Sequence, residues 1–219
     1  MNDHDIDFER DGRLGFPEFV FGESKSTEQI GAILGAFRAR GESGLVTRID
    51  AAKAEALAGA ADDLRHDPAS RTLLLGEERP RRDHGTVAIV AAGTSDVPVV
   101  AECAAVLRFL GLETRLHVDK GVAGVHRLMG SLADIRESDV VICVAGFEGA
   151  LPSVLSGLVR RPVIGVPTSV GYGVAEGGTA ALHAMLASCA NGLVVVNIDN
   201  GFGAAIAAAR ILDPERMRR

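Results

Sequence analysis

The sequence has few residues that could cross-link the chain or anchor it in a membrane. Its three cysteines, Cys103, Cys143 and Cys189, cannot all pair and form no CxxC clip, which argues against a disulfide framework and a zinc site. No uninterrupted apolar stretch reaches about 18 residues. The polar, acidic start MNDHDIDFERDGR lacks the basic and apolar regions of a signal peptide. We therefore predict reduced thiols, a cytoplasmic location and no membrane insertion.

Aromatic residues are also scarce, at 4% with one Tyr and no Trp, and 23 basic against 29 acidic residues give a net charge of −6. Such a chain offers neither the positive charge nor the stacking surfaces that bind nucleic acid, so no nucleic-acid partner is expected. Glycine, in contrast, is abundant, with 26 in 219 residues. Glycines without a fibrous period are typical of loops that turn sharply or approach a ligand.

A change of composition divides the chain. Residues 76–85 are charged, interrupted by Pro80 and bounded by glycines, which is typical of a linker. We therefore predict a small N-terminal α/β domain over residues 1–82 and a larger domain over residues 83–219.

The first domain is predicted to combine helices and strands behind an irregular N-terminal arm. Apolar residues at helical spacing predict a helix from Thr27 to Arg40, capped by Ser26 or Thr27. The apolar face of this helix consists of Ile30, Ile33, Leu34 and Phe37. Short strands are expected over residues 45–49 and 72–75, and an Ala-rich helix is expected over residues 50–64.

The second domain alternates apolar runs with helical segments, which predicts βαβ units. The fold class is therefore α/β, with a doubly wound, mostly parallel sheet of five strands that is Rossmann- or flavodoxin-like. The expected strands span residues 87–92, 114–118, 140–145, 163–166 and 193–196. The expected helices span residues 97–110, 126–138, 150–158, 176–189 and 202–212. Ligands bind at the carboxyl ends of such strands, where the glycine-rich loops of this sequence lie.

The first two strand-end loops carry groups that can hold a phosphate. Residues 93–96, Gly-Thr-Ser-Asp, combine a tight turn, two hydroxyls and the free N–H groups of a helix start. Ser95 or Asp96 could instead only cap that helix. In the second loop Arg127 can bind a phosphate and His126 can transfer protons near neutral pH, although both residue types are also ordinary in the first turn of a helix.

The third loop places one carboxylate, Glu148, between Gly146 and Gly149 after an apolar strand. Desolvation there would raise the pKa of Glu148 and suit it to proton abstraction, whereas the alternative is an exposed loop acid. The fourth loop, with Ser169 and Gly171, is only weakly similar to a dinucleotide fingerprint but suits contact with a flat or anionic ligand. Asn200 follows the last strand and could cap a helix or form a polar wall of the site.

Cys189 is expected to end a helix over residues 180–189, with Asn191 and Gly192 as its C-cap. The negative end of the helix dipole disfavours a thiolate, so Cys189 is inert unless a cationic electrophile binds beside it. Cys103 and Cys143 are expected to be small core residues.

Five segments of the second domain occur in the order GTSD, GVHR, AGFEGALPSVLSGL, PVIGVPTSVGYG and MLASCANGLVVVNIDNGFGAA. Together they resemble the LarB family of carboxylases in nickel-pincer nucleotide cofactor biosynthesis, over about residues 87–211. The stretch GRLGFPEFV at residues 12–20 resembles the first domain of that family. The second domain is also similar to aminoimidazole ribonucleotide carboxylase, the PurE family, at residues 95–96, 126–127 and 151–152.

The resemblance implies that nicotinic acid adenine dinucleotide is carboxylated on its pyridinium ring and hydrolysed at its phosphoanhydride, giving pyridinium-3,5-biscarboxylic acid mononucleotide and AMP. Cys189 would add para to the ring nitrogen, and the neighbouring carbon would attack carbon dioxide, supplied directly or from bicarbonate. Glu148 would then remove the proton from the carboxylated carbon and expel Cys189. His126 would assist proton movement or orientation.

The same resemblance implies Mg²⁺, for which Asp96 and Asp119 are possible ligands, no bound organic cofactor, and a homo-oligomer, an octamer by analogy with PurE. The residues expected to bind the substrate are Gly93, Thr94, Ser95, Asp96, Arg127, Gly146, Gly149, Ser169, Gly171 and Asn200.

Two other functions fit parts of the sequence. A purine-type carboxylase or mutase acting on aminoimidazole ribonucleotide would need no thiol, because an aminoimidazole is already a carbon nucleophile. A non-catalytic nucleotide-binding module would tolerate replacement of both Glu148 and Cys189. The SCANG segment around Cys189 favours the pyridinium substrate.

Overall fold

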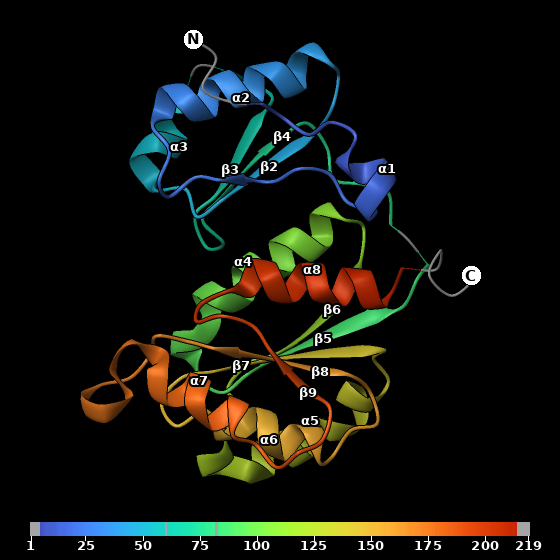
Figure 1. Ribbon diagram of the computed structural model, residues 1–219, viewed down its shortest axis with the longest axis vertical. Coiled ribbons are helices and arrows are strands. Elements are labelled where there is room, and N and C mark those ends of the chain that lie inside the picture. The colour runs from blue at the N-terminus through green and yellow to red at the C-terminus, as the bar shows by residue number, and fades with distance from the viewer. Residues whose placement is uncertain (1–4, 60, 82, 214–219) are drawn as a thin grey trace. The chain divides into compact units, whose positions relative to one another are not determined.

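The structure is a computed structural model that describes residues 5–59, 61–81 and 83–213 (Figure 1). Its residues form two compact units, Met1–Pro80 and Arg81–Arg219, so the division falls within the charged linker. No helix among the described residues is long and apolar enough to span a bilayer.

The first unit contains a four-stranded sheet in the order β1-β2-β4-β3. Strand β1 (Val20–Phe21) pairs in parallel with β2 (Gly44–Thr47), which is antiparallel to β4 (Thr72–Leu75). Helix α2 (Thr27–Ala39) packs its four predicted apolar residues into the core of this unit. Ser26 caps α2 in a capping box with Gln29, which confirms the predicted start of the helix.

The helix expected over residues 50–64 is shorter, and this prediction was wrong at its C-terminal end. Helix α3 (Ala51–Ala58) begins after the Asp50 cap and ends at Gly59. Strand β3 (Leu64–Asp67) follows instead and pairs antiparallel with β4. Its sequence Leu-Arg-His-Asp lacks the apolar alternation of a half-buried strand, so only its backbone pairing with β4 reveals it.

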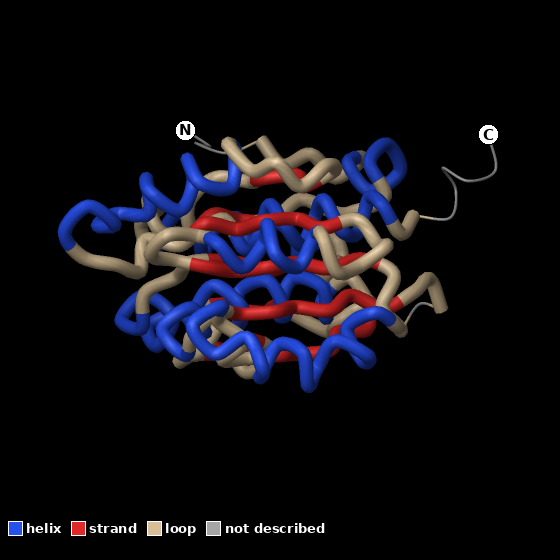
Figure 2. Tube along the Cα trace, turned by 90° about the horizontal axis from the view of Figure 1, so that it is seen from below, coloured by secondary structure: helices blue, strands red, loops and turns tan. Residues whose placement is uncertain are grey.

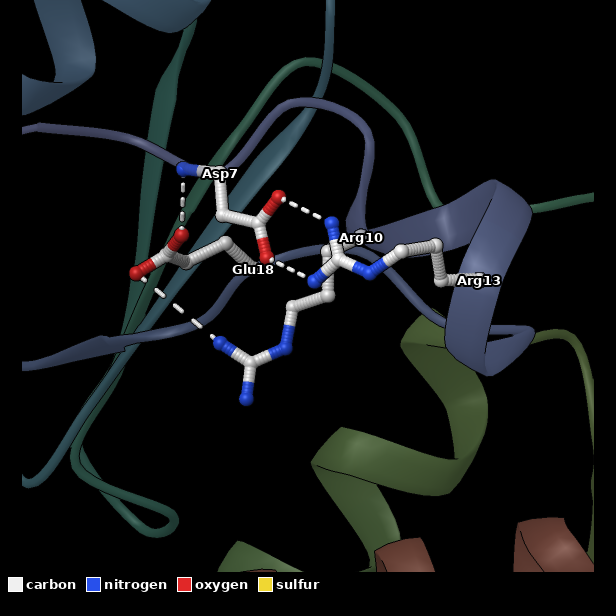
Figure 3. Close-up of polar contacts among 4 residues, drawn as sticks. All are labelled: Asp7, Arg10, Arg13 and Glu18. Atoms are coloured by element: carbon white, nitrogen blue, oxygen red, sulfur yellow. Dashed lines mark hydrogen bonds and ion pairs between the residues drawn. The ribbon is translucent and has the colours of Figure 1, made fainter.

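The N-terminal arm is also more regular than expected, because it contains α1 (Arg10–Leu14) as well as β1. Figure 3 shows the polar cluster that fastens it. Arg13 donates two hydrogen bonds to the Asp7 carboxylate, at 2.9 and 2.7 Å. Glu18 accepts the backbone N–H of Asp7 at 2.7 Å and lies 3.9 Å from the Arg10 guanidinium. Arg13 and Glu18, two charged residues of the GRLGFPEFV stretch, therefore connect parts of the N-terminal arm to one another.

The second unit contains the predicted five-stranded sheet (Figures 1 and 2), and the strand pairing shows that all of its pairs are parallel. The strand order is β6-β5-β7-β8-β9, so the direction of winding reverses between β5 and β7. The strands are β5 (Thr86–Ala91), β6 (Glu113–His117), β7 (Val140–Ala145), β8 (Val163–Pro167) and β9 (Leu193–Val195). The predicted fold class is therefore confirmed.

Helices cover both faces of this sheet, with α4 and α8 on one side and α5, α6 and α7 on the other (Figure 1). The helices are α4 (Val97–Phe109), α5 (Val125–Arg136), α6 (Ala150–Ser156), α7 (Thr179–Leu186) and α8 (Gly201–Ile211). Every residue of β7 is buried, as its continuous apolar run predicts for a central strand. Cys103 and Cys143 lie fully buried in the core as expected, and burial raises the pKa of both thiols.

Candidate active site

The carboxyl ends of the five parallel strands meet at one edge of the sheet, and most of the predicted site residues lie in the loops that follow them. The reversal between β5 and β7 makes the two loops after these strands leave in opposite directions, which opens a crevice of the kind that binds ligands in doubly wound folds. The candidate site is therefore centred on the loop at residues 92–96 and the loop at residues 146–149.

Asp96 joins three of these loops. Its Oδ2 accepts the Gly93 N–H at 2.9 Å, its Oδ1 accepts the Thr168 hydroxyl at 2.7 Å, and the Gly146 N–H also donates to it. The side chain is only 3% exposed, and this burial raises the pKa of Asp96 against the opposing effect of the three hydrogen bonds. Asp96 makes no side-chain cap bond to α4, so it acts as a connection between the ends of β5, β7 and β8.

Replacing Asp96 with asparagine is expected to destabilise the second unit. An amide has one acceptor oxygen where the carboxylate has two, so the buried donors of Gly93, Gly146 and Thr168 would compete for it. We expect Asp96→Asn to lower the free energy of unfolding by about 1–3 kcal/mol in a urea titration. The exposed neighbour Ser95 provides the control, since Ser95→Ala should leave stability within about 0.5 kcal/mol. Equal stabilities for the two variants would contradict this account of Asp96.

The second loop presents its cationic groups to solvent. His126 and Arg127 are exposed in the first turn of α5, and Arg127 forms an ion pair with Asp119. Asp119 directly precedes the glycine-containing turn that leads to α5. Arg127 is thus held at the carboxyl edge of the sheet by a partner that a bound anion could replace.

The third loop presents Glu148 at the crevice. Gly149 adopts a left-handed φ of 62° as the N-cap of α6, and a Cβ on Gly146 would lie 2.3 Å from the Val170 carbonyl oxygen. Both positions therefore require glycine. The Glu148 side chain is exposed. The described residues of one chain therefore do not provide the burial of this carboxylate that the sequence predicted.

Strained backbone conformations mark the same edge. In the described part of the second unit, the non-glycine residues with left-handed φ are Asp119 at 61°, Phe147 at 51° and Asp199 at 56°. They follow β6, β7 and β9, respectively. Each costs about 1–2 kcal/mol for an L-residue, and such strain gathers at functional sites. Phe147 also stacks edge-to-face on Tyr172, with ring centroids 5.5 Å apart.

The loops after β8 and β9 are joined to each other. The Ser169 N–H donates to the Asp199 carboxylate at 2.8 Å, while the Ser169 side chain remains exposed. The side-chain oxygen of Asn200 accepts the Gly203 N–H at 2.8 Å and so caps α8. Of the two predicted roles for Asn200, the structure confirms the helix cap. A Cβ on Gly171 would lie 2.5 Å from the Ala175 carbonyl oxygen. Close packing of the backbone therefore accounts for a glycine at this position.

Cys189 does not end a helix, which corrects the prediction. Helix α7 ends at Leu186 with Ala187 as its C-cap, and Cys189 lies exposed in the loop that leads to β9. Gly192 is left-handed but lies further along that loop. Ser188, beside the cysteine, bonds to Ser153 of α6 with 2.7 Å between the two hydroxyl oxygens. The loop is therefore fastened to the helix that begins next to Glu148.

The exposure of the three cysteines predicts selective alkylation. Iodoacetamide should modify the native protein at Cys189 alone, because Cys103 and Cys143 are buried and burial raises the pKa of their thiols. Intact-mass spectrometry should show one carboxamidomethyl group on the native chain and three after unfolding in urea. Labelling of Cys103 or Cys143 in the native protein would contradict the described packing.

The two carboxylates suggested as magnesium ligands, Asp96 and Asp119, both have other partners in the structure. Nowhere in the described part of the chain do three or more His, Cys, Asp or Glu side chains gather closely enough to hold a metal ion. Of the two suggested ligands, Asp96 is occupied by three hydrogen-bond donors and Asp119 is paired with Arg127.

Comparison with known families matches both parts of the chain. Residues 1–77 match the LarB/PurE-like N-terminal domain, and residues 86–218 match AIR carboxylase. The chain belongs to the LarB family. Its second domain is the PurE-like part of this LarB-family protein.

Individual relatives cover the chain to different extents. An uncharacterized protein of Methanocaldococcus jannaschii is 38% identical over 219 aligned residues, which cover 94% of this chain and 82% of that protein. N5-carboxyaminoimidazole ribonucleotide mutase of Pyrococcus horikoshii is 29% identical over 128 residues, 58% of this LarB-family chain and 71% of the mutase. A crystal structure of a Treponema denticola PurE variant covers 57% of this chain and 78% of that one, with a TM-score of 0.48 and 23% identity.

Several residues that connect the site were not among the predicted site residues. They are Ser153, Thr168, Ser188 and Asp199. Thr168 directly follows β8, and Asp199 lies four residues after the end of β9. Their position at the carboxyl edge of the sheet could therefore have marked them as site residues. The bond between Ser153 and Ser188 joins two elements by packing, and no pattern within the sequence indicates it.

Proposed function

We propose that this LarB-family protein carboxylates the pyridinium ring of nicotinic acid adenine dinucleotide and hydrolyses its phosphoanhydride, giving pyridinium-3,5-biscarboxylic acid mononucleotide and AMP. The observation that supports it best is the joint attachment of Cys189 and Glu148 to α6. Ser153, which bonds to the Cys189 loop, lies four residues after the Gly149 N-cap, about 6 Å along the helix axis. An exposed thiol and an exposed carboxylate are thus both fixed to one short helix.

The first chemical step belongs to Cys189. A pyridinium ring is cationic, and a positive charge in contact with the sulfur stabilises the thiolate. The thiolate adds para to the ring nitrogen, forming a carbon–sulfur bond while the nitrogen takes up the electron pair. The product is a neutral dihydropyridine whose neighbouring carbon is electron-rich.

The second and third steps form the new carboxylate and restore the ring. The electron-rich carbon attacks carbon dioxide, which forms a carbon–carbon bond and returns the positive charge to the ring nitrogen. Glu148 then accepts the proton from the carboxylated carbon, and the electron pair of that bond stays in the ring. Breaking the carbon–sulfur bond releases the Cys189 thiolate and restores the aromatic pyridinium.

The phosphate-binding role falls to the loops on either side of the crevice. The backbone N–H groups and exposed hydroxyls of Thr94 and Ser95, with Arg127, would hold the mononucleotide phosphate, and His126 would orient or move protons. The proposal includes magnesium because the family resemblance implies it, and when bound it would neutralise charge at the phosphoanhydride during hydrolysis. The reaction needs a reduced thiol, which agrees with a cytoplasmic location.

The proposed reaction also needs a second copy of the chain. Glu148, His126, Arg127 and Cys189 are all exposed in one protomer, whereas proton abstraction from carbon benefits from exclusion of water. Large apolar side chains are exposed near them, with Tyr172 at 77% and Leu186 at 65%. We therefore include a homo-oligomer, an octamer by the family resemblance, in the proposal.

Product analysis tests the proposed function directly. The protein is incubated with nicotinic acid adenine dinucleotide, Mg²⁺ and ¹³C-bicarbonate, and the products are identified by mass spectrometry. Labelled biscarboxylate mononucleotide together with AMP is the expected result. A folded protein that binds the dinucleotide but forms neither product would contradict the proposal.

The similarity to the mutase of Pyrococcus horikoshii supports a second candidate, a carboxylase or mutase of aminoimidazole ribonucleotide. The same assay with carboxyaminoimidazole ribonucleotides as substrates distinguishes the two. Turnover of these compounds by a Cys189→Ala variant would favour the purine reaction, since that chemistry needs no thiol.

A further inference from the structure

One hydroxyl in the loop that carries Cys189, that of Ser188, makes two hydrogen bonds. Ser188 Oγ accepts the backbone N–H of Ala190 at 3.1 Å, which closes a turn over Cys189. The same oxygen accepts the Ser153 hydroxyl at 2.7 Å, which fastens that turn to α6. Both serines are half-buried, so these bonds are partly shielded from water, whereas the neighbouring thiol is exposed.

The helix at the other end of this contact is itself fixed. A Cβ on Gly149 would lie 2.8 Å from the Ala181 carbonyl oxygen, so the start of α6 is in close contact with α7. Leu151 and Pro152 are buried. The position of helix α6 is therefore fixed by packing, with Glu148 directly before its N-cap, Gly149, and Ser153 in its first turn.

We propose that Ser153 and Ser188 are positioning residues that fix the Cys189 sulfur relative to the Glu148 carboxylate. This inference rests on the proposed function. Addition of the thiol to a pyridinium ring needs Cys189 alone, but release of the product needs Glu148 to reach a proton on the carbon beside the one that holds the sulfur. The distance between the two side chains therefore matters in the second half of the reaction, and the contact between the serines sets it.

Ser153→Ala and Ser188→Ala test this inference, with Ser156→Ala as a matched control. Ser156 lies on the same helix, and its buried hydroxyl has no hydrogen-bond partner among the residues that the structure describes. We expect Ser153→Ala and Ser188→Ala to lower kcat by tenfold or more with little change in KM, because a displacement of about 1 Å at a reacting group can cost about 10²-fold. Intact-mass spectrometry should show the Cys189 adduct accumulating during turnover.

Further measurements separate positioning from a general structural effect. The rate of alkylation of Cys189 by iodoacetamide should stay within about twofold of the wild-type rate, since the thiol remains exposed. Ser153→Thr retains a hydroxyl and should recover most of the wild-type kcat, whereas Ser156→Ala should match the wild type throughout.

The outcomes distinguish this inference from the proposed function. Absence of turnover by the wild-type protein overturns both. An active wild type with equal kcat for Ser153→Ala and Ser156→Ala overturns only the positioning role, and so does a Ser153→Ala defect confined to KM.

Discussion

Cys189→Ala is expected to abolish ring carboxylation, with kcat falling by at least about 10³-fold, as is usual for loss of a covalent nucleophile. The side chain is exposed, so the melting temperature should not change. Without the sulfur the pyridinium ring has no electron-rich carbon to attack carbon dioxide. The measurement is incorporation of ¹³C from bicarbonate into the ring.

Two further variants sharpen this result. Cys189→Ser keeps the shape of the side chain but offers a much weaker nucleophile, so it should also be inactive. Asn191→Ser, in the same exposed loop, should retain the wild-type rate. Label incorporation by Cys189→Ala at the wild-type rate would rule out the thiol mechanism and leave the purine-type reaction or the binding module.

Glu148→Gln is expected to stop the reaction at a later point than Cys189→Ala does. The amide cannot accept the proton from the carboxylated carbon, so kcat should fall by about 10²–10⁴-fold, the usual contribution of a general base. The thiol can still add to the ring, and the protein should gain the mass of the substrate or of its carboxylated form. Time-resolved intact-mass spectrometry distinguishes the two species.

Glu176→Gln is the matched control, because Glu176 is also an exposed acid in a loop that follows a strand of the same sheet. It should turn over at the wild-type rate with no accumulated adduct. Turnover by Glu148→Gln equal to that of Glu176→Gln would exclude Glu148 as the base.

Sequence periodicity predicted the second unit well because its central strands are buried on both faces. Strand β7 is apolar at every position, and its bounds agree with the prediction. The first unit was harder to predict, since β3 is a polar edge strand whose pairing with β4 decides its conformation. The end of α7 was also missed, because the stretch after Leu186 keeps small residues that a helix tolerates.

The positions of the candidate site residues in strand-end loops were predicted more completely than the hydrogen bonds that connect those loops. The strand-end glycines and Glu148 follow from where loops must lie in a doubly wound sheet. The exposure of Glu148 could not be predicted from the sequence, because it depends on which residues from other parts of the protein pack against its loop. Similarly, burial of Asp96 depends on Thr168, which is 72 residues away in the chain, and single-sequence patterns carry no information about such a pair.

The contact between Asp96 and Thr168 has a consequence for the order in which the protein becomes functional. Bringing together two residues that lie 72 positions apart costs chain entropy and slows folding. We therefore expect the bond between Thr168 and Asp96 to form late in folding. During synthesis, a nascent chain that has not yet released β8 from the ribosome lacks the hydroxyl that Asp96 requires. The amide hydrogens of residues 93–96 should therefore exchange freely until Thr168 is in place, even though β5 and α4 on either side of this loop are synthesised well before it.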